Sequence, residues 1–297
     1  MASRLTADRD RRGVALMLLP FGFGIVVLVA LPAVFTLAMS FYDYDLISSG
    51  SFVGLSNFRE LARDDVFWIS MVNSLGFVAA AVPLRLLGAL GLALLLHRRF
   101  RGAGAYRTAT YLPTIVPDVA YALLWLWILN PLFGPLNLLL AAVGLPTFDW
   151  LVTPDSTRAG IVLMSVFTIG EGFLVAMATR QQIPSQLYEL AEIEGAGSWH
   201  VFRKVTLPLM MPTLLLLLLR DTIFSFQITF VPAMVMTFGG PAPYATTYLP
   251  IFIYRNAFEF LRYGYAASAT VIMFLITFVI VQVQVGIVRR WRNAFVV

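Results

Sequence analysis

Five ionisable side chains lie inside long apolar stretches of this sequence, where charge is unfavourable. They are Arg85, Asp118, Glu171, Arg220 and Asp221. Placing such a group in a bilayer costs about 2.5–3.5 kcal/mol on insertion scales, so each is a candidate functional residue whose partner must be found. A carboxylate there can accept hydrogen bonds from hydroxyl groups of a ligand, or it can carry a proton. The alternative is a structural ion pair, in which one of the two arginines neutralises one of the three acids.

The sequence offers no side chains for covalent or metal chemistry. Cys is absent, and the two histidines, His97 and His200, are too few and too far apart for a metal cluster. No nucleophile–base pair stands out. The phosphate-binding pattern G-x4-G-K-[ST] is also absent. We therefore expect no catalytic residue, no metal and no bound cofactor in this chain, which would then not be an enzyme.

The elements that must position the five charges are membrane-spanning helices. Of the 297 residues, 59% are hydrophobic, and the mean hydropathy is +0.82, which is too apolar for an ordinary soluble domain. Because backbone groups cannot stay unpaired in lipid, we predict an all-α membrane protein. A spanning helix needs about 20 apolar residues. Six stretches meet this need, near 14–40, 70–96, 108–130, 157–179, 209–233 and 266–288.

Two of these stretches carry further signals. The first apolar run, Gly13 to Tyr42, has no charged residue over 30 positions. A signal-peptide core is only about 7–15 residues long, so an uncleaved first span is expected. In the third stretch Pro113 and Pro117 stand just before Asp118, which predicts a break in that helix.

The basic residues predict how the chain is oriented. Most of them fall in the N-terminal segment, the 97–107 loop, the 180–208 loop and the C-terminal tail. These are Arg4, Arg9, Arg11, Arg12, Arg98, Arg99, Arg101, Arg107, Arg180, Arg203, Lys204, Arg289, Arg290 and Arg292. The opposite loops hold only Arg59, Arg63, Arg158, Arg255 and Arg262. The positive-inside rule then places both termini and the 180–208 loop in the cytoplasm.

This distribution also predicts the domain organisation. We expect a cytoplasmic segment 1–13, a six-span membrane domain 14–290 and a cytoplasmic tail 291–297. The net charge of +5 then indicates topology and not a nucleic-acid surface.

The loop at 180–208 has a pattern that predicts a short helix–turn–helix. Its residues Tyr188 to Pro208 read YELAEIEGAGSWHVFRKVTLP. The first seven are good helix formers, and Gly195 supplies the backbone freedom for a sharp turn. Ser198 is placed to cap a second helix over 199–205, and Pro208 to close the loop where the next span begins. Such a unit could sit in a groove of a soluble partner, the alternative being an amphipathic segment at the membrane interface.

The spacing E-x-A-x3-G-x9-V-x-L-P in this loop closely resembles the EAA loop by which ABC-importer permeases contact their ATPase. The residues that carry it are Glu189, Ala191, Gly195, Val205, Leu207 and Pro208. The family pattern has a second Ala where Leu190 stands and Ile where Val205 stands; both departures are apolar and leave the spacing intact. The resemblance implies that Glu189 makes a charged contact with the ATPase, that Gly195 forms the turn, and that Ala191, Leu207 and Pro208 belong to the same coupling surface.

Other segments extend the resemblance over most of residues 15–290. FVGLSNF, RGAGAYRTATYLPTIVPDV, ILNPLFGPLN, IPSQLYELA and FGGPA…YRNAFEF…GYAAS are similar to the sugar-type importer permeases of the maltose-transporter class. This implies the type I importer permease fold, in a bacterial inner membrane. It also implies three partners: a second homologous permease, an ATPase dimer that binds ATP and Mg, and an extracytoplasmic binding protein.

The same resemblance indicates a substrate pathway. Counted from the loop, Thr168, Glu171, Asp221, Phe224 and Ser225 match positions where family members contact sugar. Gln227 is nearby and is expected to join them, and so are Asp118, Tyr121 and Trp125, which follow the expected break in the third stretch. An aromatic ring can cover the apolar face of a sugar while a carboxylate accepts from its hydroxyls. A neutral di- or oligosaccharide is the expected cargo, with polyols, amino sugars and glycerol phosphodiesters as alternatives.

Two other questions stay open. The intramembrane acids also suit a self-contained proton-coupled carrier that uses Asp118 and Glu171 as its relay. The aromatic-rich segment 238–265 fits either interfacial anchoring or a docking surface for an external protein, with a short helix dipping toward the pore.

Overall fold

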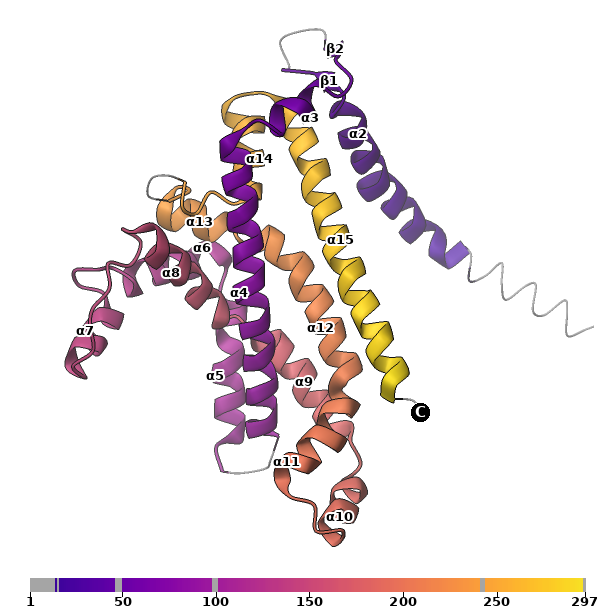
Figure 1. The fold of residues 1–297 in the computed structure, drawn as a ribbon, viewed down its shortest axis with the longest axis vertical. Coiled ribbons are helices and arrows are strands. Elements are labelled where there is room, and N and C mark those ends of the chain that lie inside the picture. The colour runs from indigo at the N-terminus through magenta and orange to yellow at the C-terminus, as the bar shows by residue number, and fades with distance from the viewer. Residues whose placement is uncertain (1–13, 15, 46–49, 98–100, 241–243, 296–297) are drawn as a thin grey trace, which may run out of the picture. The chain divides into compact units, whose positions relative to one another are not determined.

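A computed structural model describes residues 14, 16–45, 50–97, 101–240 and 244–295, without the side chains of 289–295. The predicted segments 1–13 and 291–297, and all the basic residues assigned to the cytoplasm at the two termini, therefore lie outside the fully described residues. So do Arg98 and Arg99. The chain divides into two compact units, residues 1–64 with 253–274 and residues 65–252 with 275–297. Figure 1 labels their elements.

The first unit contains a long N-terminal helix and a small polar structure around a two-stranded hairpin. Its elements are η1 (Val26–Ala30), α2 (Leu31–Met39), β1 (Tyr42–Asp43), β2 (Ser51–Phe52), α3 (Ser56–Leu61), η3 (Arg255–Glu259) and the start of α15 (Tyr263–Phe295). The strands are antiparallel, with Tyr42 opposite Phe52. The Asn57 side-chain amide donates to the carbonyls of Ser40 and Tyr42, at 3.0 Å each, so α3 is fastened to the end of α2.

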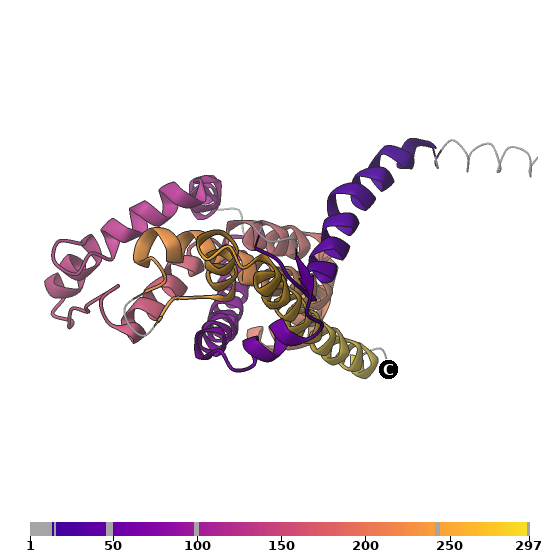
Figure 2. The ribbon, with the colours of Figure 1, turned by 90° about the horizontal axis from the view of Figure 1, so that it is seen from above.

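The second unit is built from helices. They are α4 (Asp65–Leu96), α5 (Ala103–Ile115), α6 (Asp118–Ile128), α7 (Pro135–Ala142), α8 (Pro154–Val166), α9 (Gly170–Gln182), α10 (Ser185–Ile193), α11 (Ser198–Val201), η2 (Phe202–Thr206), α12 (Leu207–Ile228), α13 (Phe230–Thr237), α14 (Leu249–Tyr254) and the rest of α15. The long helix α4 packs against α8, α9 and α12 (Figures 1 and 2).

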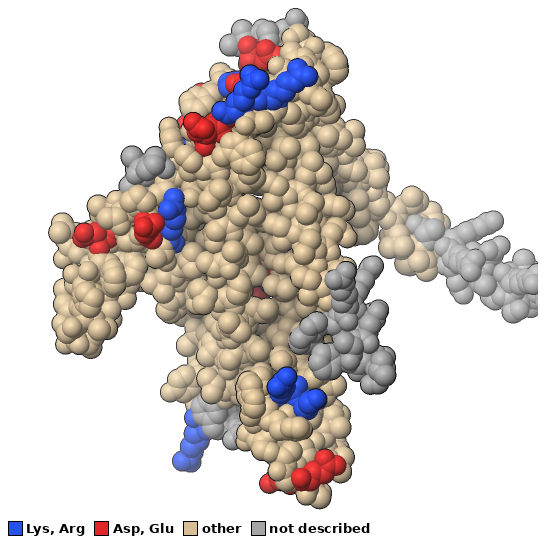
Figure 3. All heavy atoms as spheres, in the orientation of Figure 1, with Lys and Arg blue, Asp and Glu red and all other residues tan. Residues whose placement is uncertain are grey.

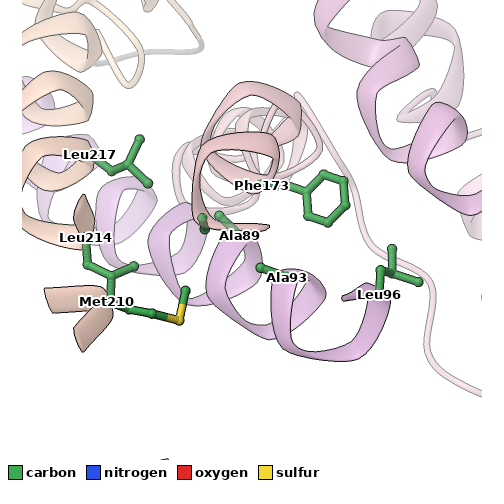
Figure 4. Close-up of a cluster of buried hydrophobic side chains, with 8 residues drawn as sticks. Ala89, Ala93, Leu96, Phe173, Met210, Leu214 and Leu217 are labelled. Atoms are coloured by element: carbon green, nitrogen blue, oxygen red, sulfur yellow. The ribbon is translucent and has the colours of Figure 1, made fainter. Parts of the chain in front are cut away.

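Small residues on α4 allow this close packing. Ala89 and Ala93 are almost fully buried and share one face of the helix, where they meet Phe173 of α9 and Met210 of α12 (Figure 4). Small side chains at such interfaces let helix backbones approach, which is the usual way that helices associate in a membrane. Arg85 lies one turn before Ala89 on the same face, so this packing directs a charged side chain between α9 and α12.

The described residues contain four helices long and apolar enough to cross a membrane, or six if each of two bent pairs is one span. The single helices are Leu16–Met39, Asp65–Leu96, Ser198–Thr237 and Tyr263–Val288. The pair α5 and α6 bends by 105°, and the pair α8 and α9 bends by 44°. The six spans predicted from the sequence equal the count in which each bent pair is one span. The bend between α5 and α6 confirms the predicted break before Asp118.

The surface of the second unit has the distribution of charge expected for contact with lipid. On the face drawn in Figure 3, almost all the side chains over the middle of α4 and α12 are uncharged. The charged side chains of this unit that this face shows gather near α8, near α10 and α11, and at the lower end of α5 (Figure 3). Charged groups are rare on surfaces that face hydrocarbon.

One predicted boundary is wrong. Pro208 does not close the loop, because the helix that begins at Ser198 continues through it to Thr237. The turn before Pro208 is a π-helix, in which the Leu207 N–H bonds to the Phe202 carbonyl. Wider turns of this kind are found where the ordinary helical hydrogen-bond pattern is interrupted, and proline, which lacks an N–H, interrupts it here. The capping residue also differs: Gly197 precedes the first helical residue, and Ser198 is itself helical.

Gly170, the first residue of α9 after the bend, lies very close to α5. A Cβ on Gly170 would lie 2.9 Å from Cα of Tyr111 on α5, and it would also collide with the Thr114 hydroxyl. We therefore expect Gly170→Ala to destabilise the protein by about 1–3 kcal/mol. Gly172→Ala is the matched control, because its Cβ would make an ordinary 3.5 Å contact with Ala89. Thermal unfolding in detergent checks this, and equal melting temperatures for the two variants would contradict it.

Candidate functional site

All five ionisable residues predicted inside the apolar stretches line one cavity of the second unit. Its volume is about 250 Å³, and its other polar lining residues are Thr114, Tyr121, Ser165, Thr168 and Thr229. The lining comes from seven helices, α4 to α6, α8, α9, α12 and α13, and from the breaks between them. Pockets for small molecules typically enclose about 300–1,000 Å³, so this cavity is slightly smaller than most.

The two helix breaks supply two of the carboxylates. Asp118 is in the first turn of α6 and Glu171 is in the first turn of α9, directly after the respective bends. A helix N-terminus carries a partial positive charge and unpaired N–H groups, so it stabilises an acid placed there. Each bend therefore creates a new helix N-terminus in the lining of the cavity, and an acidic side chain stands at each of them.

Ion pairs account for both arginines. Arg85 of α4 lies with its Nε 3.0 Å from Oδ2 of Asp221 on α12, and it donates a hydrogen bond to the Ser225 hydroxyl. Arg220 of α12 pairs with Glu171 of α9, and its guanidinium carbon is 5.0 Å from the centre of the Phe224 ring. Adjacent residues on one helix thus bind two different neighbours. The ion-pair interpretation that the sequence left open applies to both arginines.

Three polar groups of the cavity have no partner among the described residues. Asp118 has no hydrogen bond or ion pair within the part of the chain that the structure describes, and the buried hydroxyls of Thr114 and Thr229 have none there either. Thr229 is only 2% exposed, so its hydroxyl cannot turn to bulk solvent. Buried polar groups in folded proteins are nearly always satisfied, so the two buried threonine hydroxyls are groups that a polar ligand would engage. The Asp118 carboxylate is exposed and lines the same cavity, so it is accessible to that ligand as well.

Six of the nine residues predicted for the substrate pathway line the cavity. They are Asp118, Tyr121, Thr168, Glu171, Asp221 and Phe224. Tyr121 uses its hydroxyl to donate to the Met164 carbonyl at 3.1 Å, so it presents mainly its ring.

The other three predicted residues do not line it. Trp125 packs between Tyr121 and Phe167, with ring centres 6.2 and 5.2 Å away. Ser225 is buried as the acceptor for Arg85, and Gln227 is exposed. Sequence reasoning missed Thr114 and Thr229. Each adjoins a proline that was an available signal: Thr114 follows Pro113 at a helix break, and Thr229 stands three residues before Pro232, which cannot donate to the Ile228 carbonyl at the end of α12.

The predicted coupling loop contains the expected turn. Gly195 has φ +71°, its N–H bonds to the Glu192 carbonyl at 3.0 Å, and the Ala196 N–H bonds to the Ala191 carbonyl at 2.9 Å. This pair of bonds is the Schellman arrangement, which requires a left-handed residue and ends α10. The predicted turn at Gly195 is confirmed.

The same loop exposes apolar and acidic side chains. Glu189 is exposed on α10, and so are the apolar Leu190 and Ile193, at 57% and 82%. Leu207 and Pro208 stand at the start of α12. An exposed apolar group with charged neighbours is typical of a protein–protein contact, but a coupling role for these residues stays a prediction.

Comparison with known proteins identifies the family. Residues 85–293 match the family described as "Binding-protein-dependent transport system inner membrane component". The probable ABC transporter permease protein YesP of Bacillus subtilis is 34% identical, with 86% of this chain and 84% of that one covered. The trehalose/maltose transport system permease protein MalF of Thermococcus litoralis is 33% identical over 93% and 94% of the two chains.

A solved structure agrees with these relatives. The crystal structure of a bacterial ABC transporter involved in the import of the acidic polysaccharide alginate superposes with a TM-score of 0.83 at 25% identity, covering 97% of this chain and 99% of that one. The predicted resemblance to sugar-type importer permeases is therefore confirmed. With its apolar helices, its cavity of paired charges and these relatives, the chain is a multi-pass membrane protein that belongs to the binding-protein-dependent transport system inner membrane component family of ABC importer permeases.

Proposed function

We propose that this chain is the transmembrane permease subunit of an ATP-driven importer, which moves a carbohydrate across the membrane by alternating access. The observation that carries the proposal is the cavity at the two helix breaks, where Asp118, Thr114 and Thr229 have no partner among the described residues. Hydroxyl groups both donate and accept, so a sugar can satisfy a carboxylate and two threonine hydroxyls together.

The charges of the cavity favour a neutral di- or oligosaccharide. Both arginines are paired with acids, while Asp118 is unpaired among the described residues, so the lining has one more negative than positive charge. An anionic sugar would have to displace a carboxylate from Arg220 or Arg85 before binding. Because the cavity is small in this structure, the proposal requires it to widen when the spans switch between inward-facing and outward-facing arrangements.

The proposed complex contains a second homologous permease, a dimer of ATPase subunits that bind ATP and Mg, and an extracytoplasmic binding protein that delivers the sugar. In this arrangement α10 and α11 contact the ATPase on the cytoplasmic side of a bacterial inner membrane, and both termini face the cytoplasm. The exposed Leu190, Ile193 and Glu189 support this contact. The competing proton-coupled carrier receives less support, because Glu171 of its relay is held by Arg220.

A gentle detergent purification of the tagged chain tests the proposal. Recovery with one homologous permease and two ATPase copies, with ATPase activity in the eluate, would support it. Uptake should then depend on ATP and persist when a protonophore collapses the proton gradient. A chain that elutes alone even after crosslinking, or uptake that stops with the proton gradient at constant ATP, would favour the carrier.

Asp118→Asn is expected to lower the transport rate by about tenfold or more, because a hydrogen bond to a charged group contributes about 1.5–3 kcal/mol. Uptake of the sugar identified with the purified complex measures the effect, in cells that express the variant at the level of the unmodified chain. Asp155→Asn is the matched control, since Asp155 is an exposed acid of α8 outside the cavity. Equal uptake by the two variants would exclude Asp118 from the pathway.

A further inference from the structure

A group of side chains joins α9, α10 and the start of α12, away from the cavity. Arg180 is in the last turn of α9, and its guanidinium carbon lies 4.3 Å from the centre of the Tyr188 ring on α10. The Tyr188 hydroxyl is 3.0 Å from Oγ1 of Thr206, the last residue of η2. Arg180 also reaches Nε2 of His97, at 3.4 Å, just after the end of α4. None of these four residues belongs to the predicted coupling set or to the cavity.

These contacts matter because the backbone between α9 and α10 is extended. Only Ile183 and Pro184 separate the two helices, and their ψ angles of 122° and 136° are those of extended chain. Pro184 has no N–H and cannot continue the hydrogen bonds of α9 into α10. The hydrogen bonds of α9 therefore do not fix the direction of α10 at this linker, and side-chain contacts between the two helices can do so.

The chemistry of these contacts is suited to fixing the direction of α10. A guanidinium stacked on an aromatic ring is directional, and its planar shape loses little freedom on binding. The Tyr188 hydroxyl, at the edge of the ring, adds a second attachment to Thr206. Thr206 is only 4% exposed, so this attachment is anchored in packed structure.

Two of the helices joined by this group, α9 and α12, also reach the cavity. Glu171 and Arg180 stand nine residues apart on α9, a rise of about 14 Å at about 1.5 Å per residue. Thr206 lies directly before α12, which carries Arg220 further along. The Glu171–Arg220 pair thus joins the cavity ends of the same two helices whose other ends meet at Tyr188.

We propose that Arg180, Tyr188 and Thr206 form a latch that fixes α10 to α9 and α12, so that a displacement of α10 reaches the Glu171–Arg220 pair in the cavity. All three are positioning residues. The proposal rests on the proposed function, in which α10 moves with a partner ATPase.

The test uses spin labels, which the absence of native cysteine makes straightforward. One label pair, at Gln181→Cys and Glu192→Cys, reports how firmly α10 is held to α9. A second pair, at the exposed Val119→Cys of α6 and Val175→Cys of α9, reports motion beside the cavity. Distances are measured in the purified importer complex in nanodiscs, before and after adding ATP with vanadate, together with the ATPase rate.

Tyr188→Leu is expected to broaden the first distance distribution and to reduce the ATP-induced change at the second pair by at least about fivefold, with ATPase subunits still bound. Tyr188→Phe keeps the ring and loses the hydroxyl, so it should have a smaller effect. Thr206→Val should match that effect, and the double variant should be no worse than either single one. Arg203→Gln is the matched control, because Arg203 is an exposed cation of the same loop outside the latch.

Specific results would overturn the latch. Unchanged distributions in Tyr188→Leu, additive effects of Tyr188→Phe and Thr206→Val, or loss of the ATPase subunits from these variants would each do so. Failure of the proposed function would give a different result. The unmodified complex would then show no ATP-induced change in distance at the second label pair, beside the cavity. The first label pair, between α9 and α10, would still report whether Tyr188 holds α10.

Discussion

Arg85→Met is expected to destabilise the protein by about 3 kcal/mol, near the lower end of the range for breaking a buried ion pair. The Arg85 side chain is 5% exposed, and its removal leaves Asp221 without its partner between packed helices. Asp221 retains 25% exposure, toward the cavity it lines, and this partial hydration limits the loss. Thermal or denaturant unfolding of the purified chain in detergent measures the change.

A second substitution separates the lost ion pair from simple loss of packing. Arg85→Met with Asp221→Asn removes both charges, and it should recover more than half of the lost stability, because the unpaired charge is the main cost. Arg203→Met is the surface control and should stay within about 0.5 kcal/mol of the unmodified chain. If the double variant is less stable than Arg85→Met alone, the ion pair is not what holds α4 to α12.

Gly195→Pro is expected to uncouple ATP hydrolysis from transport while leaving the spans folded. Proline is confined to φ near −65°, whereas Gly195 has φ +71°, and proline also loses the N–H that bonds to Glu192. A strained or broken turn of this kind costs about 1–3 kcal/mol, enough to lower the population of the correctly formed loop by about fivefold or more.

Gly197→Pro provides the control, because Gly197 has φ −66°, which proline adopts without strain. Melting temperature, retention of the ATPase subunits and sugar transported per ATP hydrolysed should be measured for both variants. Normal transport by Gly195→Pro would count against a coupling role for this loop. A large fall in its melting temperature would show that the turn serves the fold instead.

Several features of this protein follow from local properties of the chain. The apolar stretches predicted the helices because the hydropathy and the length of a stretch depend only on its own consecutive residues. The break before Asp118 was predictable because Pro117 lacks an N–H wherever it occurs. The turn at Gly195 was predictable because the left-handed residue that ends a short helix is usually glycine. The loop pattern identified the family because it consists of residue types at fixed spacings within one short segment.

The pairing of charges was not available from the sequence. Arg220 and Asp221 are neighbours in the chain, yet the first binds Glu171 of α9 and the second binds Arg85 of α4. Adjacent helical residues point about 100° apart, so their partners depend on which helices pack on each side. The same holds for Thr229, whose place in the cavity depends on the break between α12 and α13.

Periodicity and spacing thus determined the helices, one break, the turn and the family, because each depends on a few consecutive residues. The tertiary structure decided which acids bind arginine, which acid of the cavity has no partner among the described residues, and which aromatic residues face the cavity. It excluded Trp125 and Gln227 from the lining and carried the helix through Pro208. These outcomes depend on contacts between residues far apart in the chain, whose geometry is set only when α4, α9 and α12 pack together.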